Sequence, residues 1–273
     1  DAPALKKADI GVAMGITGTD VAKEAAVMIL TDDNFATIIR AVENGRALYD
    51  NLMKYIRFQM GSLFSLIMTF LGAGLFNILA GIPFLPLQVL WVNFTVQLFL
   101  AIGLGLGSPT PGLMQRPPRS AQAQILPLPL AVQLVVIGLV MTAATLGVMQ
   151  WVLVGMHLSE PVARTMGLTT FSLASIFFAL ETNDQRRSIF SRETLESRKL
   201  LQMCGWALLA TFLVTILEFL NRIFAMSNLT VGQWVICIAA GAVVIVIGEI
   251  AKIVRRRRPH QEESFPREAQ EVQ

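Results

Sequence analysis

Two polar side chains inside a long apolar run are the first candidates for chemistry. Asn93 and Gln97 are four residues apart, so a helix would place both on one face, with Thr95 on another face. Their amide oxygens could bind a monovalent cation, or complete a site with ligands from other helices. Alternatively, the two amides could form hydrogen bonds between helices, as polar side chains in membrane proteins commonly do. The spacing leaves both interpretations open.

Carboxylates are placed differently from these amides. Glu181, Glu218 and Glu249 all lie toward the ends of apolar segments, and no acid falls near the centre of one. A divalent cation usually needs carboxylate ligands at mid-depth in a membrane, because dehydrating it is expensive. Glu249 is followed three residues later by Lys252, a spacing typical of an interfacial ion pair.

Glycines and cysteines offer no further site. Gly11, Gly15 and Gly18 match neither a GxGxxG nor a Walker spacing, so tight turns explain them better than a phosphate-binding loop. Cys204 and Cys237 sit in different apolar runs, at different expected depths. We therefore interpret them as small packed side chains and not as a disulfide.

The residues from Glu43 to Asn77 organise the chain. The first part, 43–57, is charged and amphipathic, whereas no charge follows Phe58 for the ~20 residues that an α-helix needs to cross a bilayer. Since no proline interrupts the join, we predict one helix that runs from a soluble part into the membrane. Lys54 and Arg57 would mark its cytoplasmic interface.

Composition and apolar runs predict a polytopic membrane protein. The 273 residues are 54% apolar and only 15% charged, with a mean hydropathy of +0.59. Six runs are long enough to span a membrane. They cover residues 58–79, 85–106, 127–154, 166–182, 200–220 and 231–251.

Basic residues predict the orientation of these spans. Every second loop is rich in them, which places those loops and both ends of the chain in the cytoplasm; the residues are Arg116, Arg119, Arg186, Arg187, Arg192, Arg198, Lys199, Lys252 and Arg255 to Arg258. The opposite loops hold little beyond Arg164 and Arg222. The net charge is only +3, so the basic clusters indicate topology and contact with anionic lipid, not nucleic acid. The polar tail 259–273 is expected to be disordered.

The first 35 residues predict a small α/β segment. Apolar runs at 9–14 and 27–30 read as strands, with a helix at about 19–26 between them. Thr19 or Thr31 could cap the segment after each turn, and Asp32, Asp33 and Asn34 could open the next helix. Such a segment is too small for a core of its own, so we expect most of a soluble domain to precede it.

Several spaced motifs carry a resemblance to P-type ATPases. They are Asp1, Ala2, Pro3, Ala4 and Leu5; Asp9, Gly11, Ala13, Met14 and Gly15; Asp32, Asp33, Asn34 and Phe35; Trp91 to Asn93 (WVN); and Gln115 to Arg119 (QRPPR). The first set resembles the end of the family's TGDGVNDAPAL motif, and the last two point to the type II, cation-transporting members. The resemblance covers essentially the whole chain.

The resemblance implies a domain plan and one catalytic position. Residues 1–42 would be a remnant of a HAD-like phosphorylation domain, 43–57 a cytoplasmic stalk, 58–254 a six-helix transmembrane domain, and 255–273 a basic anchor with a polar tail. Asp1 would lie beside the Mg²⁺ that serves formation and hydrolysis of an aspartyl phosphate. The chain contains neither DKTGT nor TGDG, so we expect this chain alone to be inactive, and ATP and Mg²⁺ to bind in the intact parent.

The resemblance also tests which ion is transported. Members that carry Ca²⁺ have five ligands that fall on Leu63, Leu66, Asn93, Gln97 and Ser175 of this chain. Only Asn93 matches, which argues against calcium. Asn93 and Gln97 remain as candidate ligands of the transported cation.

The function predicted from sequence is the membrane portion of an ATP-driven cation pump, with its ion pathway between the first two spans. It would lie in the plasma membrane and assemble with the missing N-terminal part of the same pump. One alternative is a non-catalytic membrane module, or a truncated product, that assembles with a partner chain. A secondary carrier would predict pseudo-repeated halves, and the six spans show no such repeat.

Overall fold

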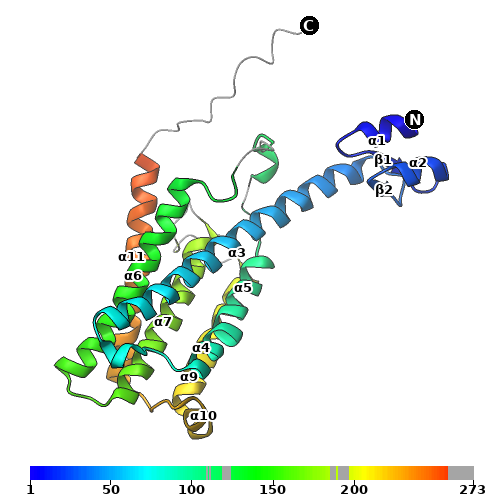
Figure 1. The fold of residues 1–273 in the computed structure, drawn as a ribbon. Helices are drawn as coiled ribbons and strands as arrows, with labels where there is room; N and C mark the ends of the chain where they lie inside the picture. Colours follow the sequence, from blue (N-terminus) through cyan, green and yellow to red (C-terminus); the bar gives the residue numbers. More distant parts are fainter. Residues whose placement is uncertain (109, 111, 119–123, 185–188, 190–196, 258–273) are drawn as a thin grey trace. The chain divides into compact units, whose positions relative to one another are not determined.

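The computed structural model describes residues 1–108, 110, 112–118, 124–184, 189 and 197–257, and it separates into two units. The first unit holds residues 1–51 and the described residues between 109 and 123; the second holds the rest (Figure 1). Several predictions fall outside the described residues: the basic residues Arg119, Arg186, Arg187, Arg192 and Arg258, and the tail 259–273.

The first unit begins with the predicted strand–helix–strand pattern. After helix α1 (Ala2–Lys7) come β1 (Val12–Met14), α2 (Asp20–Ala25) and β2 (Met28–Leu30). The two strands pair in parallel, with Ala13 opposite Ile29. The hydroxyl of Thr19 caps α2 by accepting a hydrogen bond from the Ala22 N–H at 3.3 Å, which confirms one of the two predicted caps.

Asp33 ties the turn after β1 to the turn after β2. It adopts a left-handed backbone conformation (φ 48°), and its carboxylate accepts hydrogen bonds from the N–H groups of Ile16 (2.8 Å) and Thr17 (2.7 Å) and from the Thr17 hydroxyl (2.7 Å). These bonds favour the ionised form, so they hold the pKa of Asp33 below its ordinary value. Hydrogen bonds from the Thr37 hydroxyl and the Asn34 N–H lower the pKa of Asp32 in the same way.

The organising helix is α3, which runs from Ala36 to Leu75 without interruption. This confirms the predicted continuity, although the helix begins before residue 43 and ends before Asn77. The first span therefore does not extend to residue 79 as predicted. Asn77, Leu79 and Ala80 all have positive φ, which an α-helix cannot contain, and a short 3₁₀ segment, η1 (Ile78–Gly81), follows α3.

The second predicted span has three parts: α4 (Pro86–Trp91), a π-helical segment η2 (Val92–Gln97), and α5 (Leu98–Gly105). A short η3 (Leu113–Gln115) follows in the first unit. The later spans are α6 (Leu128–Gln150) with its π-helical end η4 (Trp151–Gly155), α7 (Glu160–Asn183), α9 (Arg198–Ile216) and α11 (Val231–Arg257). Six of the described helices are long and apolar enough to cross a membrane.

Two further span boundaries differ from those predicted. Helix α7 begins at Glu160 and not at residue 166, with Ser159 at its N-cap position and a proline in its first turn, where proline suits a helix. The run 200–220 is not one helix. It breaks at Leu217, which has an extended conformation (ψ 113°), and Glu218 starts the short helix α10 (Glu218–Phe224) with a favourable acid in the first turn.

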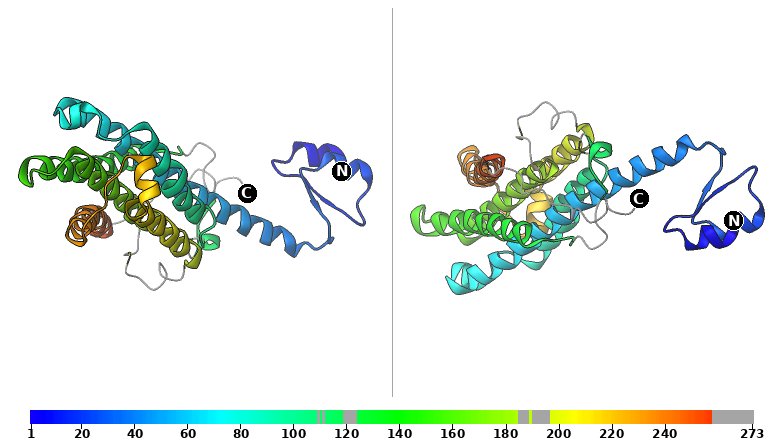
Figure 2. Two further views of the ribbon diagram at one scale, coloured as in Figure 1. Left: turned by 90° about the horizontal axis from the view of Figure 1, so that it is seen from below. Right: turned by 90° about the horizontal axis from the view of Figure 1, so that it is seen from above.

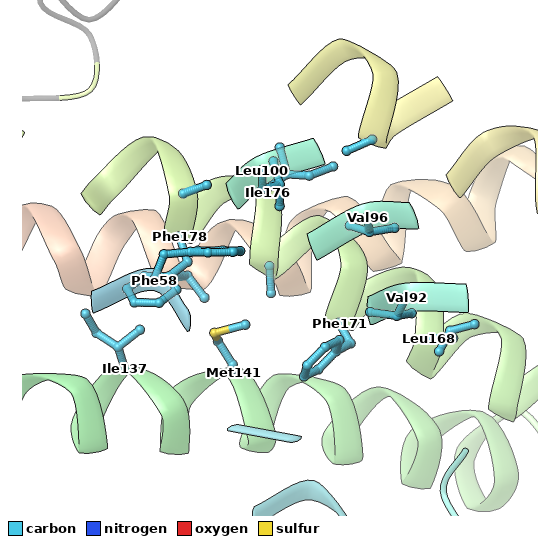
Figure 3. Packing of buried hydrophobic residues seen from close by; sticks show 14 of the residues in the cluster. Phe58, Val92, Val96, Leu100, Ile137, Met141, Leu168, Phe171, Ile176 and Phe178 are labelled. Carbon is cyan, nitrogen blue, oxygen red and sulfur yellow. The ribbon is translucent and has the colours of Figure 1, made fainter. Parts of the chain in front are cut away.

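Helix α7 lies at the centre of the second unit. Most of its side chains are buried, and it packs beside both α6 and α11, while α5 packs beside α9 (Figures 1 and 2). Aromatic side chains fill the space between these helices: the rings of Phe58 and Phe178 lie 5.9 Å apart, as do those of Phe84 and Phe171. Figure 3 shows Phe58, Phe171 and Phe178 within this core.

Candidate functional site

Both candidate cation ligands lie in the π-helical segment η2 (Val92–Gln97). A π-helical turn widens the backbone and commonly occurs at functional sites. Gln97 is only 3% exposed, and its Nε2 has no hydrogen-bond partner among the described residues. Asn93 is half-buried, and its Nδ2 donates to the carbonyl of Val89 at 2.9 Å. The structure thus places both amides in one irregular segment and leaves the Nε2 donor of the more buried one without a partner among the described residues.

Segment η2 packs against α7 and α9. Figure 3 shows Val92 and Val96 in the same core as Leu168 and Phe171 of α7. Hydroxyl groups line α7 at several buried positions, and most of them donate to a carbonyl of their own helix, among them Thr170 to Met166 (2.8 Å), Ser172 to Leu168 (2.9 Å) and Ser175 to Phe171 (2.8 Å). Their oxygens retain the capacity to accept hydrogen bonds or bind a cation.

A second set of buried polar groups lies between α3 and α6. The carbonyl of Ser65 accepts hydrogen bonds from the hydroxyls of Thr69 (2.8 Å) and Thr142 (3.0 Å), which joins the two helices. Several other buried hydroxyls, on α3, α6 and α7, find no partner among the described residues: Ser62 Oγ, Ser65 Oγ, Thr145 Oγ1 and Thr169 Oγ1. A buried polar group without a partner is unfavourable, so these positions mark where the bundle could accept a polar ligand.

The residues at the positions where carboxylates were expected carry no charge. Leu63 is 44% exposed, and Leu66 packs against the apolar core. Ser175 is fully buried, with its hydroxyl hydrogen already committed to Phe171. Among the described residues, no three or more His, Cys, Asp or Glu side chains come together as a metal site would require. The oxygen donors around η2 are therefore neutral.

Asp1, the sequence-predicted catalytic residue, belongs to the first unit. It is exposed at the N-cap position of α1 and makes no capping hydrogen bond through its side chain. The nearby glycines serve the backbone: a Cβ on Gly11 would lie 2.3 Å from the Leu5 carbonyl oxygen, and one on Gly18 would lie 2.1 Å from that of Met14. These close approaches support the prediction that the glycines form tight turns.

Arg46 and Asp50 of α3 hold residues 110–116 through contacts that were not predicted from the sequence; we call this set of contacts the clasp. Arg46 of α3 donates from Nη1 to the carbonyls of Leu113 and Arg116, both at 2.8 Å. Asp50, one turn further along α3, accepts from the N–H (3.0 Å) and hydroxyl (2.6 Å) of Thr110. The i, i+4 spacing of Arg46 and Asp50 was the available signal. Together these residues hold the segment after the second span against α3.

Two lysines of the second unit make contacts that the sequence did not predict, and Lys252 also makes its predicted contact with Glu249. Lys54 is 3% exposed and donates to the carbonyl of Ser108 at 3.2 Å, so it packs inside the protein at the level where the interface was predicted. Lys252 lies 2.6 Å from Glu181 and 3.5 Å from Glu249, its predicted partner. The closer pairing joins α7 to α11, and sequence spacing could not reveal it.

These features define a multi-pass membrane protein with a polar, irregular segment inside its helical bundle. A family model described as "Cation transporting ATPase, C-terminus" matches residues 81–254, which is more than half of the chain. The chain belongs to this family, and it is a type II P-type ATPase sequence, as the motifs predicted.

Relatives match nearly the whole chain. "Probable cation-transporting ATPase F" of Mycobacterium tuberculosis (strain ATCC 25618 / H37Rv) is 35% identical over 266 residues, 94% of this chain. "Calcium-transporting ATPase" of Bacillus subtilis is 35% identical over 245 residues, 89% of this chain, and human "Calcium-transporting ATPase type 2C member 1" is 33% identical over 258 residues, 94% of this chain. The matches cover only 28%, 27% and 28% of these relatives, respectively.

Proposed function

We propose that this chain forms the membrane domain of an ATP-driven cation pump, and that Asn93 and Gln97 help to bind the transported ion. The observation that carries the proposal is η2: a π-helical segment inside a span that holds two amide side chains, of which Gln97 is only 3% exposed. A π-helical turn interrupts the regular α-helical hydrogen bonds. Backbone carbonyl and side-chain amide oxygens there can replace the water around a cation.

The neutral donor set favours a monovalent cation. Amide and hydroxyl oxygens can replace the hydration shell of a singly charged ion, whereas a dication needs compensating negative charge. Leu63, Leu66 and Ser175 supply none at the positions where calcium-transporting members carry ligands. Any further charge would come from parts of the pump outside this chain.

Coupling to ATP would pass along α3. The helix is continuous from Ala36 to Leu75, so movement of a phosphorylation domain at its start would reach the first span without a joint. The clasp from Arg46 and Asp50 to residues 110–116 would carry the same movement to the segment after the second span. In the parent pump, ATP and Mg²⁺ would act in the phosphorylation domain, where Asp1 would lie beside the Mg²⁺.

The pump would lie in the plasma membrane with both ends of this chain in the cytoplasm. Support for this orientation comes from the described basic residues, which lie in alternate loops, at the start of the helix that follows, or near the end of the last helix: Arg116, Arg198, Lys199 and Lys252.

The test uses the pump that contains this chain, assayed for phosphoenzyme formation from ATP with Mg²⁺ across concentrations of Na⁺, K⁺ and Ca²⁺. Asn93→Ala and Gln97→Ala should each raise the concentration of the stimulating ion needed for half-maximal effect by about tenfold, equivalent to ~1.4 kcal/mol. Gln150→Ala, an exposed amide on α6, is the matched control and should change nothing. Unchanged ion dependence in both amide variants would contradict the proposed site.

A further inference from the structure

A small cavity of about 20 Å³ lies where four helices of the second unit meet. Each helix contributes a polar or charged side chain to its lining: Arg57 from α3, Gln133 from α6, Glu181 and Thr182 from α7, and Lys252 from α11. Apolar side chains complete the wall, among them Ile137 and Phe178, which Figure 3 shows in the packed core beside Phe58.

The carboxylate of Glu181 is the central group of this lining. The residue is 5% exposed, and its Oε2 lies 2.6 Å from Nζ of Lys252, whose side chain is 7% exposed. Its Oε1 has no hydrogen-bond partner among the described residues. A buried carboxylate oxygen in that state is strongly unfavourable, so the geometry calls for a donor within the cavity.

The position of the carboxylate is fixed by its neighbours. A Cβ on Gly248 of α11 would lie 2.5 Å from Cδ of Glu181, so any larger residue there would require the carboxyl group to shift. Lys252 also lies 3.5 Å from Glu249 Oε1, which accepts the N–H of Ile189 at 2.9 Å. Lys252 is thus shared between two carboxylates, and it contacts Glu181 through Oε2.

Size and charge select the ligand. A cavity needs a volume of about 10–15 Å³ to hold one water molecule, and the volume of this cavity, about 20 Å³, slightly exceeds that. Lys252 already pairs with Glu181 at 2.6 Å, so Glu181 does not need a further cation, and a neutral ligand suits this lining. Water is neutral, can donate to a carboxylate and can accept from a cationic group.

We propose that the cavity binds one water molecule, which donates a hydrogen bond to Glu181 Oε1 and bridges the Glu181–Lys252 pair to the polar groups of α3 and α6. The bridge makes the four helices share one polar junction. It is independent of the proposed ion site, because none of its residues belongs to η2.

The test is water-edited solid-state NMR on the full 273-residue chain in lipid bilayers, with ¹³C-labelled glutamate and methionine. A soluble paramagnetic chelate quenches transfer from bulk water to exposed glutamates. The Glu181 carboxyl signal is assigned by its loss in Glu181→Gln, or in Glu181→Asp if the first variant does not fold. Transfer from water to Glu181 should persist with the chelate, at least threefold above that to the fully buried Met141.

Leu134→Phe fills the cavity, since Leu134 lines it, and should reduce this transfer at least threefold. Leu146→Phe, on the same helix with the same 6% exposure but away from the cavity, should leave it unchanged. Transfer to Glu181 no greater than to Met141 in the unsubstituted chain would overturn the proposal on its own. So would transfer that Leu134→Phe leaves intact, because the water would then lie elsewhere.

Discussion

Asp50 accepts two hydrogen bonds from Thr110, one from its N–H at 3.0 Å and one from its hydroxyl at 2.6 Å, across 60 positions of sequence. A single carboxylate on α3 thus fixes the start of the segment that leaves the second span. The Asp50 side chain is 17% exposed, and Arg116 lies 3.9 Å from its other oxygen. Charged hydrogen bonds in such a setting are stronger than an exposed ion pair alone.

Asp50→Ala should therefore loosen residues 110–116. We expect amide hydrogen exchange in this segment to accelerate about tenfold, corresponding to ~1–2 kcal/mol of local stability. Thr110→Val, which keeps the N–H bond and loses the hydroxyl bond, should give a smaller effect. Asp20→Ala, at a side chain that is 97% exposed, is the control. Unchanged exchange in Asp50→Ala would show that the clasp does not hold the segment.

Acid should loosen the turns that Asp33 joins. Its pKa is lowered from 3.8 in the folded chain, first by the hydrogen bond from the Ile16 N–H. Such a group contributes stability above its unfolded pKa, and the contribution is lost as pH falls through the lowered folded value. Protection of the Ile16 and Thr17 amides, corrected for intrinsic exchange, should thus decline below about pH 3.8.

Asp33→Asn is the informative variant for this prediction. Asparagine tolerates the left-handed backbone at this position but carries no charge, so protection should be weaker at neutral pH and should no longer fall in acid. Acid-dependent protection that survives in Asp33→Asn would assign the titration to another group.

Much of this architecture could be predicted from the residues because its causes are local. The absence of proline and of charge after Phe58 predicted the continuity of α3, and long apolar runs predicted all six spans. The α/β pattern of the first unit was equally readable, down to the Thr19 cap. These features depend on neighbours a few positions apart, which a sequence displays directly.

Features that could not be predicted depend on contacts between distant positions. Lys252 has Glu249 three residues away, yet its shorter contact is with Glu181 on another helix. The π-helical turn that contains Asn93 and Gln97 could not be predicted from the residue types, because their four-residue spacing suits an α-helix equally well. The break at Leu217 involves neither proline nor glycine, so no residue type that commonly ends a helix marked it in the sequence.

Gly248→Ala should destabilise the contact between α7 and α11. The added methyl would lie 2.5 Å from Cδ of Glu181 and would push apart an ion pair held at 2.6 Å. Overpacking of this kind costs about 1–3 kcal/mol, measured as the free energy of unfolding in mixed micelles. Gly232→Ala on the same helix meets nothing within 4 Å and is the control. Equal stability of the two variants would contradict close packing between Gly248 and Glu181.

The proposed topology predicts different accessibility at two exposed positions. Cysteine introduced for Ser159, before α7, should react with an impermeant thiol reagent in intact cells, whereas cysteine introduced for Met114 should react only after permeabilisation. The native Cys204 and Cys237 are buried, so background labelling should be low. Equal labelling at both positions in intact cells would rule out the six-span orientation.

The last prediction concerns the charge of the transported ion. Asn93 and Gln97 cannot neutralise a dication, and Leu63, Leu66 and Ser175 add no negative charge. The pump that contains this chain should therefore lack a high-affinity Ca²⁺ site. Gln97→Asp restores one carboxylate within η2 and should raise Ca²⁺ affinity about tenfold or more, measured by equilibrium binding of radioactive calcium.

Gln97→Asn isolates the effect of charge in this experiment, because asparagine matches aspartate in size and remains neutral; it should not raise Ca²⁺ affinity. Glu218→Gln, at an exposed position that starts α10, should be nearly silent. Tight Ca²⁺ binding that neither Asn93→Ala nor Gln97→Ala weakens would place the ion elsewhere in the pump. Equal gains from Gln97→Asp and Gln97→Asn would show that side-chain length, and not the missing charge, limits binding at η2.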